Sequence, residues 1–174
     1  MMAIAITLKE YFEHENIHYD TIKHRRTFTT LDASRSAHLP AGNVAKAVVL
    51  ESITGDYLMA SLPANSRVSL TGVSQIMGKY YYLANEQRLQ ALFPDCVKGA
   101  IPAMGSAYDM SMIVDDSLLT ADSVYIESGD HQNFLKLSNQ EYSDLVEDMS
   151  HGDIRGKTMG APRIWERTNI NWRI

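Results

Sequence analysis

The sequence has only one cysteine and no long apolar run. A single thiol, Cys96, excludes an internal disulfide and a cluster of thiolate metal ligands. No hydrophobic run approaches the roughly 18 residues that a membrane-spanning helix needs. The first residues also lack the basic stretch that opens a signal peptide. These absences predict a cytoplasmic protein rather than a disulfide-rich secreted domain or a helical membrane protein.

What the sequence does contain is typical of one folded domain. Its 174 residues are 45% hydrophobic and 21% charged, with a net charge of −5, which permits a core and excludes a highly charged disordered chain. The charge is uneven. Residues 1–150 carry 11 Lys and Arg against 19 Asp and Glu, whereas residues 151–174 carry 5 against 2. We therefore expect a domain over residues 1–150 and a basic extension over residues 151–174.

The basic extension has two interpretations. Its tryptophans, Trp165 and Trp172, would pack on the domain or on a neighbouring subunit if the extension is structural. The reversal of charge sign would instead suit an arm that contacts nucleic acid. The sequence also leaves monomer and homodimer open.

The hydrophobic pattern predicts an α+β fold. Helices are expected at residues 7–17, 30–37, 72–78, 85–92 and 139–146, and strands at 18–23, 44–50, 57–62, 110–114, 122–128 and 133–138. Some strands are joined by turns, as at Thr54-Gly55-Asp56, and others follow helices. This mixture favours a single compact domain with a mixed, mostly antiparallel sheet and flanking helices over a doubly wound parallel fold.

The first predicted helix carries two local signals. Thr7 is a plausible N-cap, and Glu10 would complete a capping box with it. Residues 14–18 match the HExxH pattern of zinc hydrolases. Because Asn16 is a poor helix former and the match lies where the helix should end, His14 and His18 are not expected to share a helical face. A zinc hydrolase is therefore kept only as an alternative, and no metal or other cofactor is expected.

Lys46 is the only charged residue in an otherwise apolar strand, Val44-Ala-Lys-Ala-Val-Val-Leu50. Alternation places it on the face of Val44 and Val48, and its neighbours face the other way. A lysine in such a strand is rarely buried without a partner. Lys46 therefore lies either at the solvent-facing end of the strand or in a cleft, and the pattern alone does not choose.

Two further segments have the composition of shaped loops. Residues 99–105, Gly-Ala-Ile-Pro-Ala-Met-Gly, place two glycines around a proline, which fits either exposed backbone amides or an ordinary surface connection. Residues 128–131, Ser-Gly-Asp-His, lie between two apolar strands. They form either a simple hairpin turn or a site at a strand end.

The lysine strand, the glycine–proline loop and the strand-end histidine, in this order and spacing, resemble the YbaK-type aminoacyl-tRNA deacylase family, which is also seen as the editing insertion of bacterial prolyl-tRNA synthetases. The resemblance covers about residues 5–147. It implies a compact mixed α+β domain with a pocket over the sheet. Two positions depart from the family pattern: Ala47 replaces a residue that is commonly polar, and Ala103-Met104 replaces a common Pro-Phe. Both departures concern the pocket wall and hence amino-acid specificity.

The resemblance implies hydrolysis of the ester between a wrongly attached small amino acid, such as Ala, Cys or Ser, and the 3′ end of a tRNA. Synthetases separate such amino acids by only about 1–3 kcal/mol per methylene, so a second sieve is useful. Lys46 would hold the terminal phosphate or ribose near the developing negative charge, and backbone amides around Gly105 would bind the oxyanion. His131 would position the amino acid or the water.

Further residues are implied as substrate-binding. Asp130 or Ser128 would bind the α-ammonium group, and the resemblance assigns the rest of the pocket to Tyr19, Phe28, Ala47, Pro102, Met104 and Gly129. The implied partners are the aminoacylated tRNA end and an aminoacyl-tRNA synthetase, with no membrane. The alternative is a non-catalytic tRNA- or synthetase-binding module of the same fold.

Overall fold

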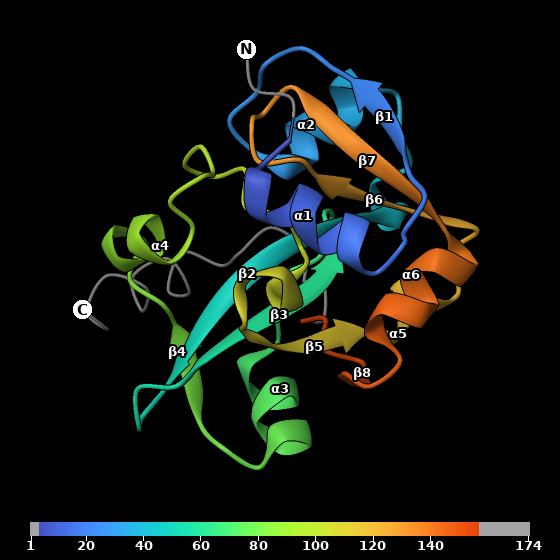
Figure 1. The fold of residues 1–174 in the computed structure, drawn as a ribbon. Coiled ribbons are helices and arrows are strands. Elements are labelled where there is room, and N and C mark those ends of the chain that lie inside the picture. Colours follow the sequence, from blue (N-terminus) through green and yellow to red (C-terminus); the bar gives the residue numbers. More distant parts are fainter. Residues whose placement is uncertain (1–3, 157–174) are drawn as a thin grey trace, which may run out of the picture.

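The computed structural model describes residues 4–156, and these residues form one eight-stranded mixed sheet (Figure 1). The strand order is β1-β7-β6-β2-β3-β5-β8, and β4 also pairs with β2. The β2–β6, β3–β5 and β5–β8 pairs are parallel, whereas the other four are antiparallel. The α+β fold predicted from the sequence is therefore confirmed. The strands are β1 (Asp20–Lys23), β2 (Val44–Ser52), β3 (Tyr57–Pro63), β4 (Tyr81–Leu83), β5 (Ser111–Asp115), β6 (Ser123–Glu127), β7 (Asn133–Ser138) and β8 (Ser150–Gly152).

Helices cover both faces of the sheet. Buried residues of α1, α5 and α6 join the largest core, together with Ala45 and Val49 of β2. Alternate residues of β2 face the other way, where Val44 packs with α2 and Leu50 packs with α3. The helices are α1 (Ile6–His14), α2 (Thr30–Ser36), α3 (Leu70–Met77), α4 (Glu86–Leu92), α5 (Asp116–Leu119) and α6 (Asn139–Val146), with short 3₁₀ turns η1 (Ala41–Asn43) and η2 (Gly105–Tyr108).

The start of α1 differs from the expectation. The N-cap is Ala5, not Thr7, and no side chain caps the helix there. The carboxylate of Asp95, far along the chain, instead accepts the N–H of Thr7 at 2.8 Å. A distant group thus replaces the local capping box, which sequence spacing cannot reveal. The other end is as expected: α1 ends at His14 and the backbone turns left-handed at Asn16, so His14 and His18 do not share a helical face.

The central strand β2 has an interrupted edge. β3 pairs with residues 45–51 along one edge. On the other edge, β6 pairs only with residues 44–45 and β4 only with residues 50–52, and Figure 1 shows these two strands near opposite ends of β2. The middle of this edge therefore has no neighbouring strand. Residues 46–48 are accordingly half-buried, whereas the residues on either side of them are buried.

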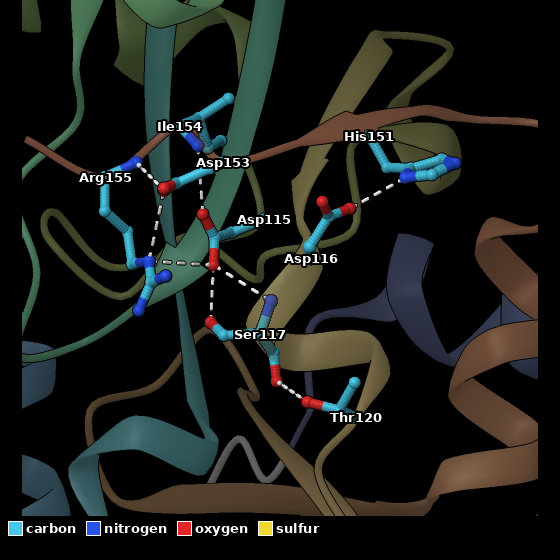
Figure 2. Close-up of polar contacts among 8 residues, drawn as sticks. All are labelled: Asp115, Asp116, Ser117, Thr120, His151, Asp153, Ile154 and Arg155. Atoms are coloured by element: carbon cyan, nitrogen blue, oxygen red, sulfur yellow. Dashed lines mark hydrogen bonds and ion pairs between the residues drawn. The ribbon is translucent and has the colours of Figure 1, made fainter.

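The end of the described chain is fixed to the sheet by Asp115 (Figure 2). The fully buried carboxylate of Asp115 accepts the N–H of Ile154 at 3.0 Å and that of Ser117 at 3.1 Å, and Arg155 Nε lies 3.3 Å from it. Because β8 also pairs with β5, the expected domain boundary after residue 150 falls inside β8.

Residues 157–174, with Trp165 and Trp172, lie outside the described residues. Neither interpretation of the extension is tested by the fold.

Candidate functional site

A cavity of about 580 Å³ lies at the interrupted edge of β2. Its volume is within the range of about 300–1,000 Å³ that is usual for small-molecule sites. The loop before α2, the open part of β2, α4 with the loop after it, and the turn after β6 supply its walls. The lining residues are Arg26, Phe28, Thr30, Ala47, Glu86, Leu89, Gln90, Phe93, Cys96, Val97, Lys98, Gly99, Ile101 and His131.

The walls differ in chemistry. Apolar side chains of α4 and of the loop after it, such as Leu89, Phe93 and Ile101, form one part of the lining, and Ala47 of β2 adds a small apolar side chain. Charged groups include Arg26 and a Lys98–Glu86 ion pair of 3.3 Å, whose side chains are largely exposed. The cavity thus combines an apolar lining with a polar margin, as expected for a ligand that has one small apolar end and one charged end.

His131 is an ionisable residue of the cavity lining that is held in place by burial and by a hydrogen bond. It is 3% exposed, and its Nε2 lies 2.6 Å from the carbonyl oxygen of Lys98. Because a carbonyl oxygen only accepts, Nε2 must carry a proton and donate it. In the neutral ring Nδ1 then has a free lone pair, and this buried atom has no hydrogen-bond partner within residues 4–156. His131 therefore holds a buried acceptor that has no partner among these residues, in a ring that lines the cavity.

The turn before His131 fixes this orientation. Asp130 Oδ1 accepts hydrogen bonds from Ser128 Oγ at 2.8 Å and from the N–H groups of Gln132 and Asn133, and its Oδ2 accepts one from Asn133 Nδ2. The carbonyl of Gly129 accepts the N–H of Val97. Ser128 and Asp130 are thus engaged in hydrogen bonds within the turn, and neither is among the residues that line this cavity. Their side chains hold His131 rather than present free groups to an ammonium ion.

Gly129 is required at its position. Its φ is +105°, and a Cβ there would lie 2.9 Å from Ala5 Cβ. Any side chain would therefore be strained in backbone and in packing.

Lys46 lies beside the cavity but not in its lining. Strand alternation directs its side chain to the face opposite Ala47. Lys46 is half-buried, and within the described part of the chain no carboxylate lies within ion-pair distance of it. Burial lowers the pKa of Lys46, and the nearby charge of Arg67 lowers it further. Lys46 is therefore a partly desolvated cation at mid-strand.

Four other candidates are not among the residues that line this cavity. Tyr19 packs on Phe12, with ring centroids 5.5 Å apart, and lines a separate polar hollow beside α6. Pro102 and Met104 are buried. Gly105 is also buried, and a Cβ there would meet Met110 O and Met112 Cγ at 3.0 Å. Gly105 thus permits close packing of the core, and the space beside its Cα is filled.

The structure therefore brings Phe28, Ala47 and His131 together around one cavity. From the glycine–proline loop it adds Gly99 and Ile101 rather than Pro102, Met104 or Gly105. Leu89 and Phe93 carried a detectable signal, since they are apolar and four residues apart near a predicted helix. Arg26 and Thr30 had no such signal, because only the path of the loop between β1 and α2 brings them to the cavity.

Cys96 lines the cavity as a thiol rather than a thiolate. It is 6% exposed, and its Sγ lies 3.2 Å from Tyr108 Oη. Burial raises the pKa of Cys96 to about 12. A cysteine in this state is a poor nucleophile at neutral pH.

Two other features are absent from the described residues: a metal-binding group and a membrane-spanning helix. Residues 4–156 contain no group of three or more His, Cys, Asp or Glu side chains that could hold a metal ion. Over the same residues, no helix combines the length and apolarity needed to cross a bilayer.

Comparison with solved structures places this fold among known ones. The chain aligns with a candidate trans-editing enzyme for prolyl tRNA synthetase at a TM-score of 0.76 and 16% identity, covering 90% of this chain and 99% of the other. A hypothetical protein aligns at a TM-score of 0.75 and 18% identity, covering 86% of this chain and 99% of the other. A candidate signal transduction protein from Marinobacter aquaeolei VT8 aligns at 0.71 and 15%, covering 88% of this chain and 31% of the other. At these identities the likeness shows the fold.

Comparison at the level of sequence families is more specific. No curated protein matches the chain. Residues 24–145, well over half of the sequence, match the model of the aminoacyl-tRNA editing domain, and this segment runs from the loop that lines the cavity to the last helix. The resemblance read from the lysine strand, the loop and the histidine is thereby confirmed, and the chain belongs to the aminoacyl-tRNA editing domain family.

Proposed function

We propose that the protein hydrolyses the ester bond that joins a small amino acid, such as Ala, Cys or Ser, to the 3′ end of a tRNA. The observation that supports this most is the cavity at the β2 edge, which is lined by His131 in a chain of the editing-domain family. The buried Nδ1 of His131 has no hydrogen-bond partner within residues 4–156. Water adds to the carbonyl carbon, the bond to the ribose oxygen breaks, and that oxygen takes up a proton. The products are a free amino acid and an uncharged tRNA.

Each group has a role that suits its position. The Nδ1 lone pair of His131 accepts a hydrogen bond from the water or from the α-ammonium group. Lys46 directs its side chain to the other face of β2, and it supplies positive charge for the part of the terminal phosphate or ribose that extends past the open edge. Phe28 lines the cavity while remaining 89% exposed, so its ring is available for stacking on the terminal base.

The protein's charge sets how the tRNA binds. With a net charge of −5 over the whole chain, the protein makes few phosphate contacts, and binding is expected to be weak and salt-sensitive. We propose that the basic residues of 151–174 or a synthetase partner assist, and that the protein acts in the cytoplasm, where aminoacyl-tRNA is used.

Substitution of Lys46 or His131 tests the function. Lys46→Ala is expected to lower deacylation of L-alanyl-, L-cysteinyl- or L-seryl-tRNA about 10–100-fold, because a hydrogen bond to a charged group is lost. His131→Asn, chosen because Asn tolerates the left-handed backbone at this position (φ +60°), is expected to lower it about 100-fold. The measurement is the rate of ester hydrolysis with purified protein.

The matched control is Lys136→Ala, which removes a lysine from the separate hollow near α6. It should leave the rate unchanged. Wild-type protein that binds these tRNAs without hydrolysing them would support the binding-module alternative. Normal hydrolysis by Lys46→Ala would remove Lys46 from the proposed site.

A further inference from the structure

The open edge of β2 leaves one peptide unit available to a ligand. In the β2–β3 ladder the N–H of Ala64 bonds to the carbonyl of Val44, which fixes the alternation along β2. Lys46 and Val48 therefore direct their backbone groups toward β3, and Ala45, Ala47 and Val49 direct theirs toward the opposite edge.

Only Ala47 lacks a neighbour on that edge. Ala45 pairs with Ile126 of β6, and the carbonyl of Val49 accepts the N–H of Ala84 just beyond β4. Within residues 4–156, no hydrogen bond from a loop, turn or side chain reaches the N–H or the carbonyl of Ala47. Ala47 also lines the cavity. One donor and one acceptor, at the spacing of a single strand residue, thus face the ligand space.

An aminoacyl ester carries the complementary pair of groups. Its α-ammonium donates and its ester carbonyl accepts, and they are separated by one Cα, as in any strand residue. Two residues that face each other in a hydrogen-bonded antiparallel pair exchange both of their backbone hydrogen bonds, with Cα atoms about 5.5 Å apart. A single aminoacyl group can therefore occupy the place of a missing strand residue opposite Ala47.

We propose that the backbone of Ala47 binds the aminoacyl group in this way, an inference that rests on the proposed function. The carbonyl of Ala47 accepts a hydrogen bond from the α-ammonium group, and its N–H donates to the ester carbonyl oxygen. When water adds to the carbonyl carbon, that oxygen gains negative charge, and the same N–H stabilises it. The N–H of Ala47 thus takes the oxyanion-binding role that the sequence suggested for amides around Gly105, where the space is filled by packed side chains and backbone.

This pairing also selects the configuration of the amino acid. Residues that face each other in a ladder place their side chains on the same face of the sheet. The side chain of an L-amino acid then lies beside that of Ala47, on the face of the cavity, and a D-amino acid would direct its side chain toward the face of Lys46. The methyl group of Ala47, where a larger side chain would intrude, leaves room for the substrate's side chain.

One proline variant and one serine variant of Ala47 test whether its N–H is the donor. Ala47→Pro removes the N–H that faces the open edge, and the ladder with β3 does not use this N–H. Because the proline ring also fixes φ, the fold of this variant is checked separately. We expect deacylation of L-alanyl-tRNA to fall about 100-fold, as when one oxyanion donor is lost. Ala47→Ser retains the N–H and should remain within about tenfold of wild type. Circular dichroism and thermal unfolding verify that both variants fold.

A second experiment uses wild-type protein alone, so it tests the proposed pairing with Ala47 even if Ala47→Pro does not fold. L-alanyl-, D-alanyl- and propionyl-tRNA are compared as enhancements over their own spontaneous hydrolysis. Loss of the α-ammonium in propionyl-tRNA should lower the enhancement about 10–100-fold, since a charged hydrogen bond disappears. The D-alanyl ester should also be hydrolysed at least about tenfold more slowly, a factor worth roughly 1.4 kcal/mol.

The outcomes separate the inference from the function. No hydrolysis of any mischarged tRNA by wild-type protein would overturn the proposed function and this inference with it. Hydrolysis by wild type with equal enhancement for all three esters, or a folded Ala47→Pro as active as Ala47→Ser, would overturn the inference alone.

Discussion

Glu127→Gln is expected to raise the free energy of unfolding by several kcal/mol at pH 8.5 and to leave it unchanged at pH 4.5. Glu127, the last residue of β6, is 1% exposed, and neither of its carboxyl oxygens has a hydrogen-bond partner within residues 4–156. Burial raises the pKa of Glu127 from 4.5 to about 8, and the carboxylate of Asp130 adds to the rise. At neutral pH this side chain is therefore a buried, uncharged acid.

The direction of the pH dependence follows from proton uptake. Below pH 4.5 the folded and unfolded states both hold the proton, so Glu127 has no effect. Between pH 4.5 and 8 only the folded state holds it, so unfolding releases a proton and becomes easier as the pH rises. A pKa difference of this size corresponds to about 5 kcal/mol once the pH exceeds 8. A neutral glutamine avoids this loss.

Urea unfolding of both proteins between pH 4.5 and 8.5 measures the effect. Glu51→Gln is the matched control, because Glu51 is also a buried strand glutamate (7% exposed) but is paired with Arg88 at 2.9 Å. Its substitution should destabilise the protein at neutral pH, since an ion pair is lost. Parallel pH profiles for wild type and Glu127→Gln would show that Glu127 is not a buried acid.

The contrast between these two glutamates shows what the sequence can and cannot predict. The apolar strand at 44–50 and the hairpin of residues 122–128 and 133–138 are visible in the pattern and form as β2, β6 and β7. The pairing of β4 with β2, which leaves the edge open between them, depends on contacts between residues about 30 apart in the chain. Neither the pairing of Glu51 nor the isolation of Glu127 can be read from strand periodicity.

The candidate site shows the same division. The glycine–proline loop was recognisable as a shaped loop, but its two halves serve different purposes: Gly99 and Ile101 line the cavity, and Pro102, Met104 and Gly105 lie in the protein interior. Composition marks a loop as irregular without showing which of its residues face inward. Neighbouring residues of a strand face opposite ways, so Lys46 and Ala47 lie on opposite faces of β2. The strand pattern alone does not show which of these faces borders the cavity.

The turn that holds His131 is the second place where a large effect is expected. Asp130→Ala should lower the free energy of unfolding by about 3–5 kcal/mol, because the donors of Ser128, Gln132 and Asn133 would lose their acceptor in a mostly buried turn. Deacylation should fall in parallel, since the left-handed backbone of His131 (φ +60°) depends on this turn.

Asp130→Asn separates the two contributions of this carboxylate. The amide oxygen can still accept from the backbone N–H groups, but its NH₂ would face the NH₂ of Asn133, so part of the destabilisation should remain. The charge is gone, however, and with it one cause of the raised pKa of Glu127. The fall in stability above pH 4.5 should therefore end at a lower pH in Asp130→Asn than in wild type. If urea unfolding of Asp130→Asn shows the same pH profile as wild type, the carboxyl groups of Asp130 and Glu127 do not interact. If Asp130→Ala is as stable as wild type, the turn does not need the hydrogen bonds of the Asp130 carboxylate.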